Sequence, residues 1–202
     1  MKFSIKVALG AQILAFISAV PFTYADDPEY DHPHDVRVNI LDTKNFSNKD
    51  QKKLDTVIAT VESVLSSEAF HQRVLNYTYQ GKKQFAWNDG KTNEEIYREL
   101  MQGNESSTPG ANGVVDLSVD LWTPWYIFSK ALAYTTPSTK WIHLKKSYYR
   151  SGSISALADT MVHEWTHKLG FNHPYNATAE RPYTVPYGVG GIVDDLASKL
   201  GN

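Results

Sequence analysis

The feature that most constrains this chain is the spacing of the histidines between residues 163 and 173. The segment reads HExxHxxGxxH: His163-Glu164-Trp165-Thr166-His167-Lys168-Leu169-Gly170-Phe171-Asn172-His173. Residues four apart on an α-helix lie on one face, so His163 and His167 can present their imidazoles to a single metal ion. His173 can join them only if the chain turns first. Gly170 allows that turn, because glycine adopts a positive φ at a helix end without steric cost.

This residue set points to zinc. Three neutral imidazoles leave one position of a tetrahedral Zn²⁺ open for water, which is typical of a catalytic rather than a structural site. Glu164 follows the first histidine and can accept a proton from that water. The simpler interpretation is a solvated helix that happens to carry histidines. A chance match to the whole pattern is expected on the order of once in 10⁴–10⁵ chains of this length. We therefore expect a Zn²⁺ cofactor held by His163, His167 and His173, with Glu164 as the general base.

The segment resembles the extended zinc signature of the metzincin metallopeptidases. The resemblance implies an α+β fold, that is, a metzincin-like (zincin) domain. Such a domain has a small twisted mixed sheet, a scaffold helix, a zinc-binding active-site helix and an irregular C-terminal subdomain that ends in a short helix. It also implies a zinc metallopeptidase that hydrolyses peptide bonds with metal-activated water, and hence a peptide or protein as the substrate.

Metzincins carry a methionine in a tight turn beneath the zinc, downstream of the third histidine. Here every methionine precedes that histidine: Met1, Met101 and Met161. Where the turn is expected, the chain reads Thr184-Val185-Pro186-Tyr187-Gly188. Proline and glycine favour a turn there. We expect Tyr187 to lie beside the metal, with its hydroxyl as a catalytic group for the oxyanion, and structural packing is an equal alternative.

The N-terminal residues have the pattern of a secretory signal peptide. Lys2 and Lys6 precede an apolar core over residues 7–20, and a small-residue cleavage site ends at Ala25. The apolar run is too short to span a bilayer comfortably. We expect cleavage after Ala25, which leaves residues 26–202 as a single metallopeptidase-like catalytic domain. The mature protein is expected to be secreted or periplasmic.

Composition restricts the partners. The chain has no cysteine, so neither disulfides nor lipoprotein attachment are available. Its formal net charge is −2, and removing a leader with two lysines makes it −4. That mild balance predicts no nucleic-acid partner and no anionic membrane surface. No other stretch is apolar enough for a membrane span, and we expect a monomer.

Hydrophobic periodicity predicts the elements around the site. Strands are expected at 36–40 and 115–121, the second with one wet face, and a hairpin from 131–135 and 140–148. Helices are expected to begin at capping boxes at Ser47 and Thr92, with a short helix within 68–80 and a terminal one over 192–200. Residues 103–113 are expected to form a surface loop or, equally, a disordered excursion. By likeness to metzincins, 140–148 is the edge strand that pairs with the substrate, and His143 on it is expected to be an exposed residue rather than a fourth ligand.

The helix that carries the motif is expected to pack on the core with one face and to present the histidines on the other. Ser153 or Ser155 can cap it, and its apolar stripe is Ile154, Leu157, Ala158, Met161 and Trp165. His163 and His167 each lie two residues past a stripe position, about 200° round the helix, so they face away from the packed side. Asp159 can accept an imidazole N–H or can be a plain exposed carboxylate.

Two other functions fit the same motif. One is a secreted zinc-binding protein with a non-catalytic, interaction role, although such a protein has no need of Glu164. The other is a zinc amidase or deacetylase that acts on cell-wall or sugar substrates.

Overall fold

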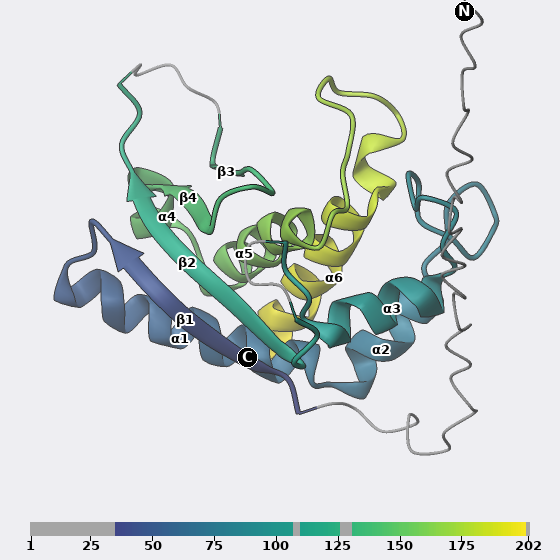
Figure 1. The fold of residues 1–202 in the computed structure, drawn as a ribbon, viewed down its shortest axis with the longest axis horizontal. Coiled ribbons are helices and arrows are strands. Elements are labelled where there is room, and N and C mark those ends of the chain that lie inside the picture. Colours follow the sequence, from purple (N-terminus) through teal and green to yellow (C-terminus); the bar gives the residue numbers. More distant parts are fainter. Residues whose placement is uncertain (1–34, 107–109, 126–130, 201–202) are drawn as a thin grey trace, which may run out of the picture. The chain divides into compact units, whose positions relative to one another are not determined.

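A computed structural model of the chain describes residues 35–106, 110–125 and 131–200. The signal peptide predicted over residues 1–25 lies outside this part. The described residues form a mixed four-stranded sheet and six α-helices (Figure 1), which confirms the α+β class. In chain order, the elements are β1 (Arg37–Lys44), α1 (Asn48–Leu65), α2 (Glu68–Leu75), α3 (Asn93–Gln102), β2 (Val114–Trp122), β3 (Ala133–Thr135), β4 (Trp141–Lys145), α4 (Lys146–Ser151), α5 (Ile154–Lys168), the short 3₁₀ helix η2 (Arg181–Tyr183) and α6 (Val185–Leu200).

The sheet has the strand order β1-β2-β4-β3. β1, β2 and β4 are parallel, and β3 pairs antiparallel with β4. The hairpin prediction is confirmed, but the assignment of 140–148 as the edge strand is wrong, because β4 lies between β2 and β3. The strand also ends at Lys145, where α4 begins. Alternation along a strand identifies its buried face and carries no information on which arm of a hairpin lies outside.

The second face of β2 is not wet, which corrects the sequence interpretation. Ser118 is fully buried and Asp120 is nearly so. Asp120 accepts a hydrogen bond from Asn45, and its other oxygen lies 2.9 Å from Nδ1 of His143. The ring of Tyr134 on β3 stacks on that imidazole with 4.5 Å between ring centroids. His143 is therefore a partly buried member of the sheet's second face and not an exposed residue.

α1 begins as its sequence predicts and packs on the sheet. Ser47 and Asp50 form a reciprocal capping box, in which each side chain bonds the other residue's main-chain N–H. In Figure 1, α1 runs behind β1 and β2. Its apolar stripe joins one core with the inward faces of β2 and β4 and with α5 and α6. Arg150 of α4 binds the Asp50 carboxylate at 2.8 Å, which ties the start of α1 to the segment that leads into α5.

α6 is longer than predicted. An irregular segment was expected to run to residue 191, with a helix over 192–200, whereas α6 already begins at Val185. Pro186 fits the first turn, where no main-chain N–H is needed. Gly188 and Gly190 weaken the helical pattern in the sequence, yet they allow close packing. A Cβ at Gly188 would come within 2.8 Å of the Tyr77 and Phe85 rings, and one at Gly190 would overlap the Asp159 carboxylate.

Within the part of the chain that the structure describes, no helix combines the length and apolarity needed to cross a membrane.

Candidate metal centre

The end of α5 makes the turn that the motif predicts. Gly170 has φ +101°, in the left-handed region that favours glycine. The N–H of Gly170 donates to the His167 carbonyl, and the N–H of Phe171 donates to the Thr166 carbonyl. These two bonds are those of a Schellman motif, which closes a helix and reverses the chain direction. The turn brings residue 173 back toward the face of α5 that carries the first two histidines.

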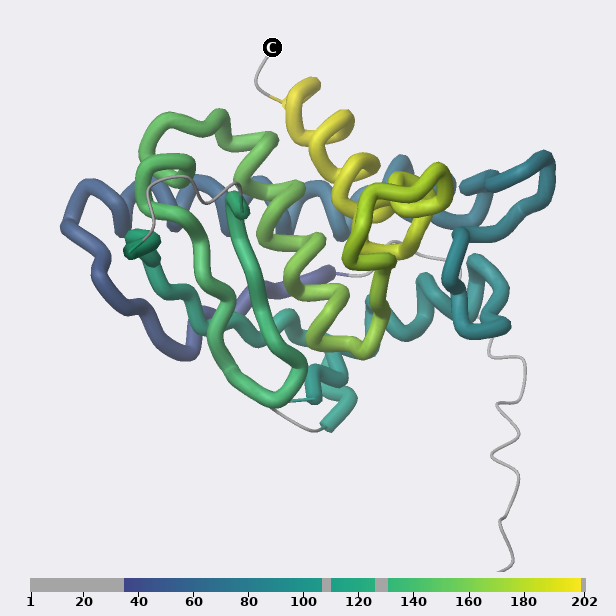
Figure 2. The backbone as a smooth tube through the Cα atoms, turned by 90° about the horizontal axis from the view of Figure 1, so that it is seen from above, coloured from purple at the N-terminus to yellow at the C-terminus, as the bar shows by residue number. Residues whose placement is uncertain are grey.

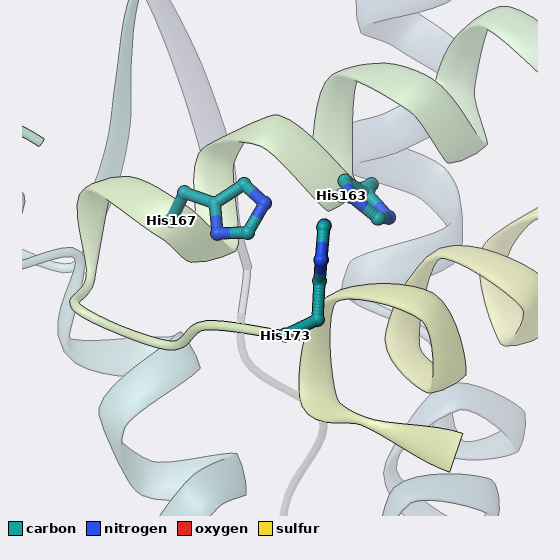
Figure 3. A group of neighbouring side chains, drawn as sticks. All are labelled: His163, His167 and His173. Carbon is teal, nitrogen blue, oxygen red and sulfur yellow. The ribbon is translucent and has the colours of Figure 1, made fainter. Parts of the chain in front are cut away.

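His163, His167 and His173 converge on one point. One ligand nitrogen from each imidazole lies within 4.8 Å of the other two, a spacing at which the group could hold a metal ion. Figure 3 shows His163 and His167 projecting from α5 and His173 approaching them from the segment after the turn. The convergence expected from the sequence is therefore present among the described residues.

Main-chain carbonyls fix the orientation of the imidazoles. Nδ1 of His167 lies 2.7 Å from the Phe171 carbonyl oxygen, and Nδ1 of His173 lies 3.1 Å from that of Pro174. A carbonyl only accepts, so each Nδ1 carries the proton and each Nε2 is free to bind a metal. The Pro186 carbonyl at the start of α6 accepts a hydrogen bond from His163.

The surroundings keep the imidazoles neutral, which is the form that binds metal. Burial lowers the pKa of His163 to about 3, and the two neighbouring histidines and Arg181 add to this effect. Burial also lowers the pKa of His167 and of His173 below the usual histidine value. A proton therefore does not compete with a metal ion at neutral pH.

Glu164 is 6 % exposed, yet it lies on the wall of the same cavity. Burial raises the pKa of its carboxyl to about 7, against the opposing effects of the nearby Lys168 charge and a hydrogen bond from the Thr135 main-chain N–H. A carboxyl with a pKa near neutrality can both accept and return a proton at that pH. Glu164 therefore has the environment of an acid–base group.

Lys168 joins α5 to the β3–β4 hairpin. Its side chain is 2 % exposed, and Nζ donates to the main-chain carbonyls of Thr136 and Thr139 in the connecting turn. Figure 2 shows the hairpin alongside α5. The bonds hold β3 against the helix, at the place where the Thr135 N–H reaches Glu164. This role was not predicted from the sequence, although Lys168 lies three residues after Trp165, in line with the apolar stripe of α5.

The Tyr187 ring contacts two of the three histidines, and the residue belongs to the first turn of α6 rather than to a loop. Its ring centroid is 4.5 Å from that of His163 and 4.9 Å from that of His173. The other two tyrosines of this region differ: Tyr175 is 94 % exposed and Tyr183 is 43 % exposed. Asp159 borders the cavity but packs against Gly190, and main-chain carbonyls take the imidazole N–H groups for which it was a candidate.

The metal centre opens into a cavity of about 640 Å³. Its lining includes the strand β3 with the residues before it, and also Arg181 and Tyr187. Glu105 is fully buried and accepts a hydrogen bond from Nε1 of Trp165, on the helix α5 that carries the first two histidines, at 2.6 Å. Glu105 comes from the segment predicted as a surface loop, whose Gly, Ser and Asn content conceals a residue that anchors α5.

No protein-family model, curated protein or solved structure matches the chain.

Proposed function

We propose that this protein is a secreted zinc-dependent endopeptidase of the metzincin type, with His163, His167 and His173 as the zinc ligands. The observation that carries the proposal is the convergence of three neutral imidazoles, a buried carboxyl and a tyrosine on one cavity. When bound, zinc supplies a Lewis acid that polarises a carbonyl and allows water to ionise near neutral pH.

The donor set fits zinc. Imidazole nitrogens suit a borderline-soft cation, and three protein ligands leave a coordination position for water or substrate. The carbonyls that accept from His167 and His173 supply the outer partners that metal-binding imidazoles usually have. Each ligand is therefore already oriented and neutral before a metal arrives.

Glu164 carries the proton in the proposed reaction. It takes a proton from the attacking water and passes it to the leaving nitrogen of the cleaved peptide bond. In the metal-free chain burial already raises the pKa of its carboxyl above the usual glutamate value, which favours uptake of a proton. The Thr135 N–H and the charge of Lys168 hold the carboxylate on the cavity wall.

The substrate is proposed to lie along β3. This three-residue strand is the sheet's edge beside the cavity, so an extended peptide can pair with its outward main-chain groups other than the Thr135 N–H, which bonds Glu164. Tyr187 lines the same cavity and contacts His163 and His173, and its hydroxyl is proposed to stabilise the oxyanion. The metzincin assignment rests on this edge strand together with the HExxHxxGxxH helix and its Gly170 turn.

The decisive experiment compares Glu164→Gln with the wild type, on a broad peptide library with and without a chelator. We expect chelator-sensitive cleavage by the wild type and a loss of about 10²-fold or more in kcat for the variant, because a positioned proton carrier contributes about 10²–10⁴-fold. Zinc content should stay the same. Glu94→Gln, in the first turn of α3, makes the same substitution at an exposed glutamate that does not line the cavity, and it should cleave as the wild type does.

Other results separate the alternatives. A protein that binds zinc and cleaves no peptide would be the zinc-binding interaction protein. Chelator-sensitive release of products from peptidoglycan fragments or acetylated sugars, without peptide cleavage, would select the amidase or deacetylase. Normal activity of Glu164→Gln would show that the base is misassigned.

A further inference from the structure

Arg181 places a guanidinium in the wall of the metal cavity. It begins η2 and lines the cavity together with the histidines and Tyr187. The guanidinium carbon lies 5.1 Å from the centre of the Tyr187 ring, a cation–π arrangement. The side chain is partly buried, so the cavity holds a fixed positive charge beside the proposed reaction centre.

Most hydrogen-bonding capacity of this guanidinium is unused. Nη1 donates to the Tyr175 carbonyl at 3.1 Å. Nε is buried and has no acceptor. Within the described residues no carboxylate forms an ion pair with Arg181, in contrast to Arg73 and Arg150, which bind Asp195 and Asp50. Because Nε is closed to solvent, an arriving anion would meet the N–H groups on the two Nη atoms, on the part of the side chain that lines the cavity.

The acidic groups of the cavity do not supply that anion. Glu164 is held by the Thr135 N–H and lies near Lys168, and Asp159 packs against Gly190. A cation close to a site for a divalent metal is also electrostatically unfavourable unless a negative charge arrives with the ligand. The free part of the guanidinium therefore fits an acceptor that comes from outside the chain.

We propose that Arg181 binds a carboxylate of the substrate, so that the cavity selects peptides with a negative charge close to the cleaved bond. This inference rests on the proposed function and specifies its substrate class. A planar guanidinium suits a carboxylate better than an ammonium group does, because it offers parallel N–H donors at a fixed spacing. The carboxylate can belong to an aspartate or glutamate side chain or to a free C-terminus.

The test uses peptides of one sequence that differ in a single group. One pair has glutamate or glutamine beside the cleaved bond, and the other has a free or an amidated C-terminus. We expect the wild type to prefer one of the charged forms by about 10–100-fold in kcat/KM, the range for a hydrogen bond to a charged group. The preferred pair identifies the source of the carboxylate.

Variants of Arg181 then test the residue itself. In Arg181→Met the ratio of charged to neutral peptide should fall to near one, and Arg181→Lys should retain part of it. Arg73→Met removes an arginine between α2 and α6 and should keep the wild-type ratio. Zinc content and the thermal midpoint confirm that each variant is folded. A wild type without preference, or an Arg181→Met variant that keeps the wild-type ratio, overturns the proposal.

Binding separates this inference from the proposed function. Titration calorimetry of the zinc-loaded Glu164→Gln protein with the same peptides needs no turnover. We expect about 10-fold or greater tightening by the carboxylate, lost in Glu164→Gln/Arg181→Met. A binding preference without cleavage by the wild type would overturn the endopeptidase and keep the carboxylate site. Cleavage without either preference would overturn only the carboxylate site.

Discussion

Of the three proposed ligands, His173 tests the metal centre with the least damage to α5, because it lies beyond the helix in the segment after the Gly170 turn. In His173→Ala we expect zinc affinity to fall roughly 10-fold or more, since even outer partners of metal ligands cost this much. Competition with a zinc indicator measures the change. His71→Gln, on α2, is the matched control, and an unchanged affinity in His173→Ala would remove His173 from the ligand set.

Gly170 tests the turn through backbone conformation alone. A Cβ at this position meets nothing within 4 Å, but φ is +101°. We expect Gly170→Ala to lower the free energy of unfolding by about 1–2 kcal/mol, because an L-residue is strained there. Zinc affinity should fall as well, since the turn positions both His173 and the carbonyl that orients His167.

Gly191 of α6 provides the control for that substitution. It too has open space around a Cβ, and it has no positive φ. In Gly191→Ala the free energy of unfolding should rise by up to about 1 kcal/mol, the difference in helix propensity between the two residues. Urea unfolding measures both variants, and equal shifts would contradict the proposed role of the Gly170 backbone.

At the scale of elements, the β3–β4 hairpin depends on one buried ammonium. Lys168→Met keeps most of the side-chain volume but removes the donors to Thr136 and Thr139. We expect faster amide hydrogen exchange in the hairpin and a higher KM, because the proposed substrate strand would be held less firmly.

Lys140 is the matched lysine within the hairpin. It forms an exposed ion pair with Asp42, and such pairs contribute little to stability. Lys140→Met should therefore leave hairpin exchange and KM close to the wild-type values. If Lys168→Met behaves in the same way, β3 is held by packing rather than by the lysine.

The elements themselves were largely predictable where local chemistry decides. Capping boxes at Ser47 and Thr92 set the starts of α1 and α3, and the 3.6-residue period set their buried faces. The order of β3 and β4 was not predictable, because it depends on long-range pairing. The start of α6 was not predictable either, because Pro186 and the glycines that follow it favour a turn. They fit a helix here through close packing on Tyr77 and Phe85.

The residues of the site also differ in how well the sequence predicts them. The three histidines and Glu164 stand at fixed offsets around one helix turn, so their spacing in the chain is informative. Arg181 and Glu105 reach the site from segments without periodicity, and only the folded chain brings them there. The roles of these two residues depend on how deeply each is buried and on which hydrogen-bond partners it has. The sequence shows neither.

At the scale of the whole molecule, buried carboxyls give the metal-free protein a stability that depends on pH. The Arg150 guanidinium and the Ser47 cap hold the pKa of Asp50 well below its usual range. The unfolded value is about 3.9, so this stabilisation is present above that pH and is lost as the pH falls below it.

Asp159 acts in the opposite sense. Burial and the neighbouring Asp194 raise its pKa to about 6, so the folded chain holds this proton more tightly than the unfolded chain does. Its contribution is favourable below the unfolded value near 3.9 and is lost as the pH rises through 6. Glu105, whose pKa burial also raises, has the same sense.

The buried neutral histidines oppose Asp159 over the same range, because the unfolded chain takes up protons on them below about pH 6.5 more readily than the folded chain does. The carboxyl contributions are therefore measured as differences in the free energy of unfolding between the wild type and single variants of the metal-free protein. Urea unfolding as a function of pH, in the presence of a chelator, gives these differences. The stability advantage of the wild type over Asp50→Asn should shrink as the pH falls below about 4, and its stability relative to Asp159→Asn should decrease as the pH rises from about 4 to 7. A stability curve that keeps its shape in both variants would assign the pH dependence to other groups.

The acceptors that orient the imidazoles are main-chain atoms of Phe171, Pro174 and Pro186. No point mutation at these three positions can delete such an acceptor, because every amino acid carries the same carbonyl. The alignment of the ligands is therefore protected against genetic drift in the residues that provide it. In a saturation mutagenesis screen, tolerance at these positions should depend on side-chain size and backbone shape, while positions 163, 167 and 173 accept almost no replacement.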